Sequence, residues 1–351
     1  MMVHNSNQST RMAFNLHPII VFIMLILTGC GNPRAERVIL DTDMGSDCDD
    51  VGALALLHHY AATGRAEILG VIYSSGAVPY GAGVVDAINH FYDRSDIPVG
   101  ACHDTTFGDP VDKMNAEVLA KNSTVFGNEI VHNLDAPEQT TLNRKLLAAQ
   151  PDGSVTYITI GHTRGLYELL ISSPDSISGL SGRELIERKV KRWVALGAMG
   201  SANSEGHRAR DWNFFFNGTA GYTDYLVTHF PVHMEFVDGG SRVFTGGSLR
   251  QTPPGNIVRL AYKKWLQNVE GKQLQDQRPS WDLVTVLYAI EGSHEYFDDL
   301  GPGLLDFDPI NGCLWSARAE HGKHRMIRQK EGTDAILADY LNQIISGNQD
   351  Y

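Results

Sequence analysis

The chain has 351 residues, of which 42% are hydrophobic and 9% aromatic, enough for one large α/β domain or two ordinary ones. Its formal charge is -12, from 29 basic and 41 acidic residues. Because a nucleic-acid surface needs clustered basic side chains, this balance argues against nucleic acid as a partner. It is compatible with a cation site, or simply with solubility.

The N-terminus has the pattern of a lipoprotein signal. Arg11 precedes the apolar run 19–27, which is too short to span a bilayer as a mature helix and fits a secretory signal core. The run ends in Leu-Thr-Gly-Cys at 27–30, which resembles the bacterial lipobox, in which the cysteine is lipidated. We expect a signal peptide over 1–29, a tether over 30–36 lipidated at Cys30, and export to the outer membrane or periplasm. An ordinary signal peptide with a chance cysteine is the alternative.

Three cysteines remain after such cleavage, at positions 48, 102 and 313. An odd and widely spaced set provides no disulfide framework, although one pair stays open. A metal site made of thiolates is not supported.

The mature chain begins with alternating strands and helices. The short β-rich run 37–40 ends at acidic residues and predicts a buried parallel strand. Apolar residues at helical spacing follow from Val51 to His58, and 67–74 predicts a second strand. This βαβ unit places the acidic residues at the carboxyl end of the first strand, where open α/β sheets bind ligands.

The alternation continues to the C-terminus. Further strands are predicted at 97–99, 155–160, 193–196 and 232–237, and helices at 84–92, 163–172, 218–228, 281–290 and 334–345. The stretch 242–279 is the least regular and is interpreted as an inserted cap or helical lobe. The pattern predicts one doubly wound α/β domain over 37–351, with a mostly parallel sheet and helices on both faces.

Five carboxylates fall within the ten residues that follow the first strand: Asp41, Asp43, Asp47, Asp49 and Asp50. Like charges this close raise each other's pKa or require a cation, and no Lys or Arg lies nearby in sequence. A dense set of oxygen ligands without paired Cys or His favours Ca²⁺ or Mg²⁺ over zinc. The spacing is not that of an EF-hand loop. A charged helix cap without metal is the alternative.

Four blocks of the sequence resemble the inosine/uridine-preferring nucleoside hydrolase family. The run 38–54 (VILDTDMGSDCDDVGAL) is similar to the family's N-terminal signature, in which a strand ends in Asp-x-Asp-Pro-Gly-x-Asp-Asp. The later blocks, in the family's order, are ITIGHTRGL at 158–166, DWNF at 211–214 and SWD at 280–282. The resemblance covers most of the mature chain and implies a calcium-dependent N-ribosyl hydrolase of nucleosides or related ribosides.

The resemblance also assigns roles to residues. Asp43 would be the general base and a calcium ligand. The other calcium ligands would be Asp50, Asp282 and the backbone carbonyl of Ile160. The substrate would be bound by Asp49, Asp211, Asn213 and Trp281. Since members of the family are commonly dimers or tetramers, a homo-oligomer is also expected.

The chain departs from the family pattern in ways that leave several questions open. Its loop has two extra residues, so Asp47 could take the role given to Asp49. Trp281 stands where the family has a histidine, and it could stack on a planar leaving group or simply pack in the core. His207 and His162 are the histidines that could replace the missing acid or contact the site. The alternative functions are hydrolysis of another glycoside and calcium-dependent binding of a sugar or nucleoside without catalysis.

Overall fold

The computed structural model describes residues 1–2, 35–292, 295–317 and 322–347. The expected signal peptide over 1–29 and the lipidated Cys30 lie outside these ranges, apart from Met1 and Met2. Of the expected tether, Ala35 and Glu36 are described, and Glu36 begins the first strand. No helix within the described residues is both long enough and apolar enough to span a bilayer.

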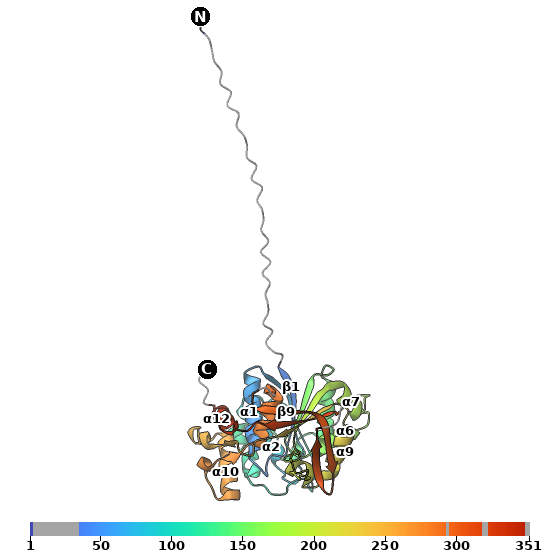
Figure 1. Ribbon diagram of the computed structural model, residues 1–351. Coiled ribbons are helices and arrows are strands. Elements are labelled where there is room, and N and C mark those ends of the chain that lie inside the picture. The colour runs from blue at the N-terminus through green and yellow to red at the C-terminus, as the bar shows by residue number, and fades with distance from the viewer. Residues whose placement is uncertain (3–34, 293–294, 318–321, 348–351) are drawn as a thin grey trace. The chain divides into compact units, whose positions relative to one another are not determined.

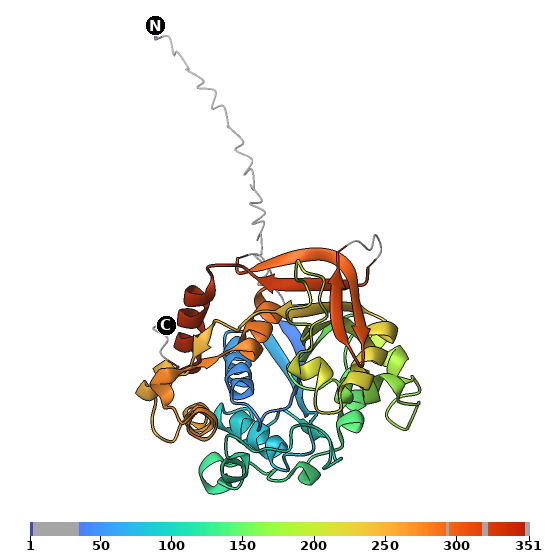
Figure 2. The same cartoon turned by 60° about the horizontal axis from the view of Figure 1, so that its bottom comes forward.

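The folded unit that starts at Ala35 is built on one nine-stranded sheet, in the order β10-β9-β11-β6-β5-β4-β1-β2-β3 (Figure 1). Its parallel strands are β1 (Glu36–Thr42), β2 (Ala66–Tyr73), β3 (Val99–Ala101), β4 (Val155–Thr159), β5 (Val190–Leu196), β6 (His233–Asp238) and β11 (His324–Gln329). The antiparallel strands β9 (Phe297–Asp308) and β10 (Gly312–Ser316) complete it at one edge. Figure 2 shows this edge in orange and red.

Helices cover both faces of the sheet, because successive strand residues point to opposite sides. Val38 and Leu40 pack on one side, while Ile39 packs on the other. The first face is covered by α1 (Asp49–Ala62), α2 (Gly81–Phe91), α10 (Ile257–Trp265), α11 (Trp281–Glu291) and α12 (Asp334–Ile345). The second is covered by α5 (Gln139–Ala148), α6 (Arg164–Ile171), α7 (Gly182–Lys189) and α9 (Ala220–His229). The predicted doubly wound, mostly parallel α/β fold is therefore confirmed.

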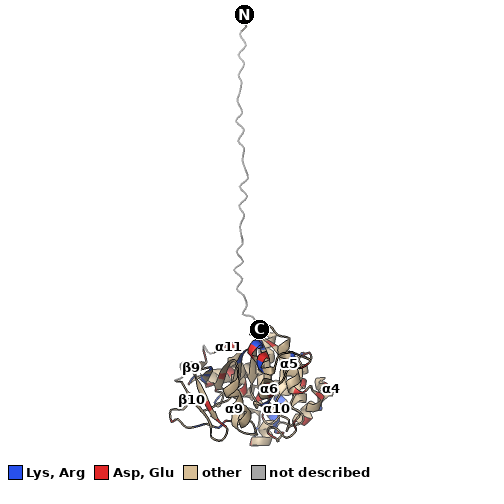
Figure 3. Cartoon of the chain, turned by 90° about the vertical axis from the view of Figure 1, so that its right-hand side faces the viewer, with Lys and Arg blue, Asp and Glu red and all other residues tan. Residues whose placement is uncertain are grey.

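Several elements differ from the sequence expectation. The structure adds α5, α7 and the three strands β9 to β11, and it places β3 two residues later than the predicted strand at 97–99. The irregular stretch 242–279 contains α10, two short strands β7 (Phe244–Thr245) and β8 (Arg278–Pro279), and several short turns of helix. On the side shown in Figure 3, acidic and basic positions are scattered among the elements.

Candidate functional site

The candidate site lies where the order of the sheet reverses. The strands β2 and β3 extend the sheet on one side of β1, and β4, β5 and β6 extend it on the other. Loops leaving the carboxyl ends of β1 and β4 therefore diverge and leave a crevice between them. The predicted aspartate loop follows β1, and Ile160 directly follows β4.

Three buried carboxylates meet in this crevice. Asp49 and Asp50 occupy the first turn of α1, and Asp282 occupies the first turn of α11. One carboxylate oxygen from each lies within 4.8 Å of the other two. The positive end of each helix favours a negative charge in its first turn. The two helices approach closely because residue 52 of α1 is glycine: a Cβ there would lie 2.9 Å from the side chain of Leu283.

Each α1 carboxylate is oriented by hydrogen bonds. The hydroxyl of Thr42, at the end of β1, donates to Oδ1 of Asp50 over 2.5 Å. The backbone N–H groups of Trp281 and Asp282 approach Oδ2 of Asp49, at 3.1 and 3.4 Å. The start of α11 is thus bonded to the start of α1. Trp281 and Asp282 share one site with Asp49, although they follow it by 232 and 233 positions in the sequence.

This cluster fits a hard cation. Burial, reinforced by the charge of the neighbouring aspartates, raises the pKa of Asp49, Asp50 and Asp282 well above its usual range. Three carboxylates in one buried site carry their charges together only when a cation neutralises them. Oxygen ligands without a cysteine or histidine among them are the donor set of Ca²⁺ or Mg²⁺.

Asp43 is buried in the loop after β1 and lines the same cavity, but it is not one of the three clustered carboxylates. Burial, with the charges of Asp47 and Asp109, raises the pKa of Asp43 to about 7. Gly161 makes room for it, since a Cβ at Gly161 would lie 2.6 Å from the backbone nitrogen of Asp43. The structure therefore groups Asp49, which was expected to bind sugar, with Asp50 and Asp282, and it leaves Asp43 beside them.

Asp47 has a partner that the sequence did not reveal. The guanidinium of Arg278, on β8, donates from Nε to Oδ1 of Asp47 over 3.0 Å and from Nη2 to Oδ2. No Lys or Arg lies near this loop in the sequence, but folding brings Arg278 next to it. Arg278 thus neutralises Asp47, and the two residues of this stretch that belong to the cluster are Asp49 and Asp50.

The predicted ribose-binding block forms the opposite wall. Asp211 caps the short helix α8 (Trp212–Phe215), accepting hydrogen bonds from the N–H groups of Ala198 and Phe214, each at 2.9 Å. The amide of Asn213 donates to the carbonyl of Ile160 over 2.7 Å. A carbonyl oxygen has a second lone pair, so this bond leaves Ile160 able to act as a metal ligand.

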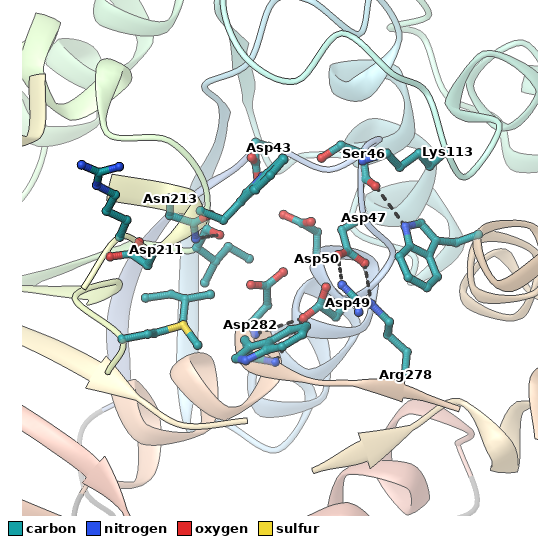
Figure 4. A pocket seen from close by; sticks show the side chains of 17 residues that line it. Asp43, Ser46, Asp47, Asp49, Asp50, Lys113, Asp211, Asn213, Arg278 and Asp282 are labelled. Atoms are coloured by element: carbon teal, nitrogen blue, oxygen red, sulfur yellow. Dashed lines mark hydrogen bonds and ion pairs between the residues drawn. The ribbon is translucent and has the colours of Figure 1, made fainter. Parts of the chain in front are cut away.

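A cavity of about 460 Å³ connects these walls (Figure 4). All eight residues predicted for the site line it. Asp47, which was left open as a substitute for Asp49, also lines it. The lining residues that sequence reasoning missed are Ser46, Lys113, Leu196, Met199, Arg210, Trp212, Trp265 and Arg278. Asp47 and Arg278 form the pair just described, and Trp212 belongs to the DWNF block at 211–214. Trp265 and Lys113 come from segments without a local motif.

The two candidate histidines lie in different environments, and neither lines the cavity. His207 is largely exposed and lies beside Glu205, outside the residues that line the cavity. His162 is fully buried, with Nε2 3.2 Å from Oδ2 of Asp43. Burial lowers the pKa of His162 to about 4, so its ring is neutral at neutral pH. It thus lies behind Asp43 and does not line the cavity.

The acidic site lies at the switch point of a doubly wound sheet, and solved structures show which fold the chain shares. No family model and no curated protein matches the sequence. A plant nucleoside hydrolase matches with a TM-score of 0.61 at 16% identity, over 90% of this chain and 99% of its own. The purine-preferring ribonucleoside hydrolase from Gardnerella vaginalis matches with a TM-score of 0.61 at 13% identity, over 89% and 98%.

The type III effector protein XopQ, solved with adenosine diphosphate ribose, matches with a TM-score of 0.59 at 13% identity, over 90% and 94% of the two chains. Identities this low establish a shared fold. The chain therefore has the nucleoside hydrolase fold, which confirms the fold expected from the four sequence blocks.

Proposed function

We propose that this protein is a Ca²⁺-dependent hydrolase that cleaves the N-glycosidic bond of ribonucleosides or related ribosides. The observation that carries the proposal is the buried cluster of Asp49, Asp50 and Asp282 in a cavity of about 460 Å³ that Asp43 also lines. The nucleoside hydrolase fold supports it.

Calcium would be held by Asp49, Asp50 and Asp282, with the carbonyl of Ile160 and the carboxylate of Asp43 at the margin of the site. Bound there, the cation would supply a Lewis acid that favours the ionisation of water at neutral pH. Asp211 and Asn213 lie on the wall opposite Asp47 and would bind the hydroxyl groups of the sugar.

Asp43 acts as the general base. Its carboxylate lines the cavity beside the cluster, and a carboxylate in that place can accept a proton from water. As the water oxygen bonds to the anomeric carbon, the bond from that carbon to the leaving nitrogen breaks through an oxocarbenium-like transition state. The carboxylates around the sugar stabilise the positive charge that develops on it.

A substrate panel tests this function. The purified full chain is expected to release reducing sugar from at least one member of a set containing purine and pyrimidine nucleosides, adenosine diphosphate ribose and simple ribosides. Activity is expected to disappear with a chelator and to return with added Ca²⁺, because the three carboxylates then lose and regain their counter-charge. If only a glycoside without ribose is cleaved, the alternative of a hydrolase for another glycoside is favoured. If a sugar or nucleoside binds tightly but is not cleaved, the alternative of a non-catalytic binding protein is favoured.

We further propose that the chain is exported and anchored to the cell envelope through lipidated Cys30, and that it forms a homo-oligomer. Replacement Cys30→Ser is expected to abolish incorporation of labelled fatty acid and to leave the N-terminal segment uncleaved, because the thiol is the site of acylation. Metabolic labelling and N-terminal mass analysis measure both effects, and light scattering measures the oligomer. Unchanged labelling of Cys30→Ser would rule out this anchor.

A further inference from the structure

Arg278 lies on the far side of the acidic cluster from the proposed base. In the view of Figure 4, Asp49 and Asp50 lie between Asp43, at the top, and Arg278, at the lower right. Both residues line the cavity. A water activated at Asp43 attacks the anomeric carbon from its own side, so the leaving group departs toward the opposite side.

The Arg278 side chain is held rigidly in this position. Its guanidinium carbon lies 4.1 Å from the ring centre of Trp265 and 4.7 Å from that of Trp281. The indole N–H of Trp265 in turn donates to the carbonyl of Ser46 over 3.0 Å, and Asp47 fixes the guanidinium along one edge. The side chain is 13% exposed. A charge fixed and partly desolvated in this way acts more strongly than one in water.

The pair with Asp47 does not exhaust the hydrogen-bonding capacity of Arg278. A guanidinium has five N–H groups, and Asp47 accepts from two of its nitrogens, Nε and Nη2. Within the described residues, no hydrogen bond from Nη1 is present. Donors at the wall of a cavity, without a protein partner, are suited to a ligand that carries lone pairs or negative charge.

We propose that Arg278 is a catalytic residue that hydrogen-bonds the leaving group and stabilises the negative charge it acquires; this inference rests on the proposed hydrolase function. When the bond to the anomeric carbon breaks, its electron pair goes to the leaving nitrogen. Arginine stays protonated, so Arg278 acts as a donor and not as an acid. The new carbon–oxygen bond comes from water, whose proton goes first to Asp43 and then to solvent. Solvent water protonates the departed base, so the products are ribose and the neutral base.

The test compares two leaving groups. A nucleoside base leaves as a poorly stabilised anion, whereas 4-nitrophenolate is stable without help. We expect Arg278→Met to lower kcat/KM for the best nucleoside of the panel by about 100-fold, the scale of losing one fixed donor, and to lower it far less for 4-nitrophenyl riboside. Arg278→Lys keeps the positive charge but lacks the planar guanidinium, so its kcat/KM for the nucleoside is expected to lie between those of the wild type and Arg278→Met.

Two controls isolate the effect. The double variant Asp47→Asn/Arg278→Met removes both members of the pair, so it reports whether an unpaired Asp47 causes the loss; it is expected to show the same dependence on the leaving group. Thermal unfolding with and without Ca²⁺ reports whether the acidic cluster is intact.

The outcomes separate the two claims. If Arg278→Met lowers kcat/KM equally for both substrates, or for neither, the role of Arg278 is overturned. Activity of the wild type would still support the proposed hydrolase function. If the wild-type chain cleaves neither substrate, nor any other in the panel, the proposed function itself is wrong and this role falls with it.

Discussion

Replacing Asp43 by Asn is expected to lower kcat on the best riboside by about 10³-fold, within the range that general-base catalysis contributes. Asn keeps the size and shape of the side chain but cannot accept a proton from water. The three clustered carboxylates are untouched, so Ca²⁺ binding is expected to persist. Steady-state kinetics at saturating substrate measure the loss, and Ca²⁺ titration of the variant measures the binding.

A buried carboxylate far from the cavity provides the control. Asp86, on α2, accepts hydrogen bonds from the N–H groups of Glu129 and Ile130 and does not line the cavity. Asp86→Asn is expected to weaken the fold without lowering kcat more than a few-fold. If Asp43→Asn keeps the wild-type kcat, Asp43 is not the base.

Replacing Asp282 by Asn is expected to change the response of stability to calcium. In the wild type, ligand at 100 times its dissociation constant stabilises the folded state by about 2.7 kcal/mol, which raises Tm by several degrees. Since ligand charge tunes calcium affinity, removing one carboxylate of three is expected to weaken binding on the order of 100-fold. The shift in Tm at a fixed, moderate Ca²⁺ concentration should then largely disappear.

Without calcium, Asp282→Asn is not expected to be less stable than the wild type. Burial and the charges of Asp49, Asp50 and Asp43 disfavour the ionised form of Asp282, so removing that charge relieves the folded state. With a chelator present, Asp282→Asn is therefore expected to melt at or above the wild-type temperature at neutral pH. Differential scanning calorimetry measures both arms. A calcium-independent Tm in the wild type would contradict the proposed metal site.

The central strands could be predicted because each is a short apolar run between turn residues. The segments that became β1, β4, β5 and β6 are largely buried on both faces, and β1 and β5 contain the uninterrupted apolar runs VIL and WVAL. The strand β9 could not be predicted in this way. Its sequence FDDLGPGLLDFD alternates between buried and exposed positions only from Gly303 to Phe307. It also contains Gly301-Pro302-Gly303, which in a sequence is typical of a loop.

The site residues likewise differ in whether a local pattern in the sequence identified them. Asp43, Asp49 and Asp50 were identified from the density of carboxylates at the end of one strand, which is a local signal. Asp211 and Asp282 were reached only through the family resemblance, because each is a single acid near a helix start. Arg278, Trp265 and Lys113 carried no signal, since nothing local in a sequence tells which side chain of a distant segment will face a cavity.

The contact between the starts of α1 and α11 fixes the order in which the site can form. Asp49 and Asp50 leave any synthesis or transport machinery long before Asp282, which lies more than two hundred positions later. A chain that lacks its last quarter holds only two of the three clustered carboxylates. The proposed metal site is therefore complete only after the starts of α1 and α11 have come together, so tight binding of its ion is expected to report that this long-range contact has formed.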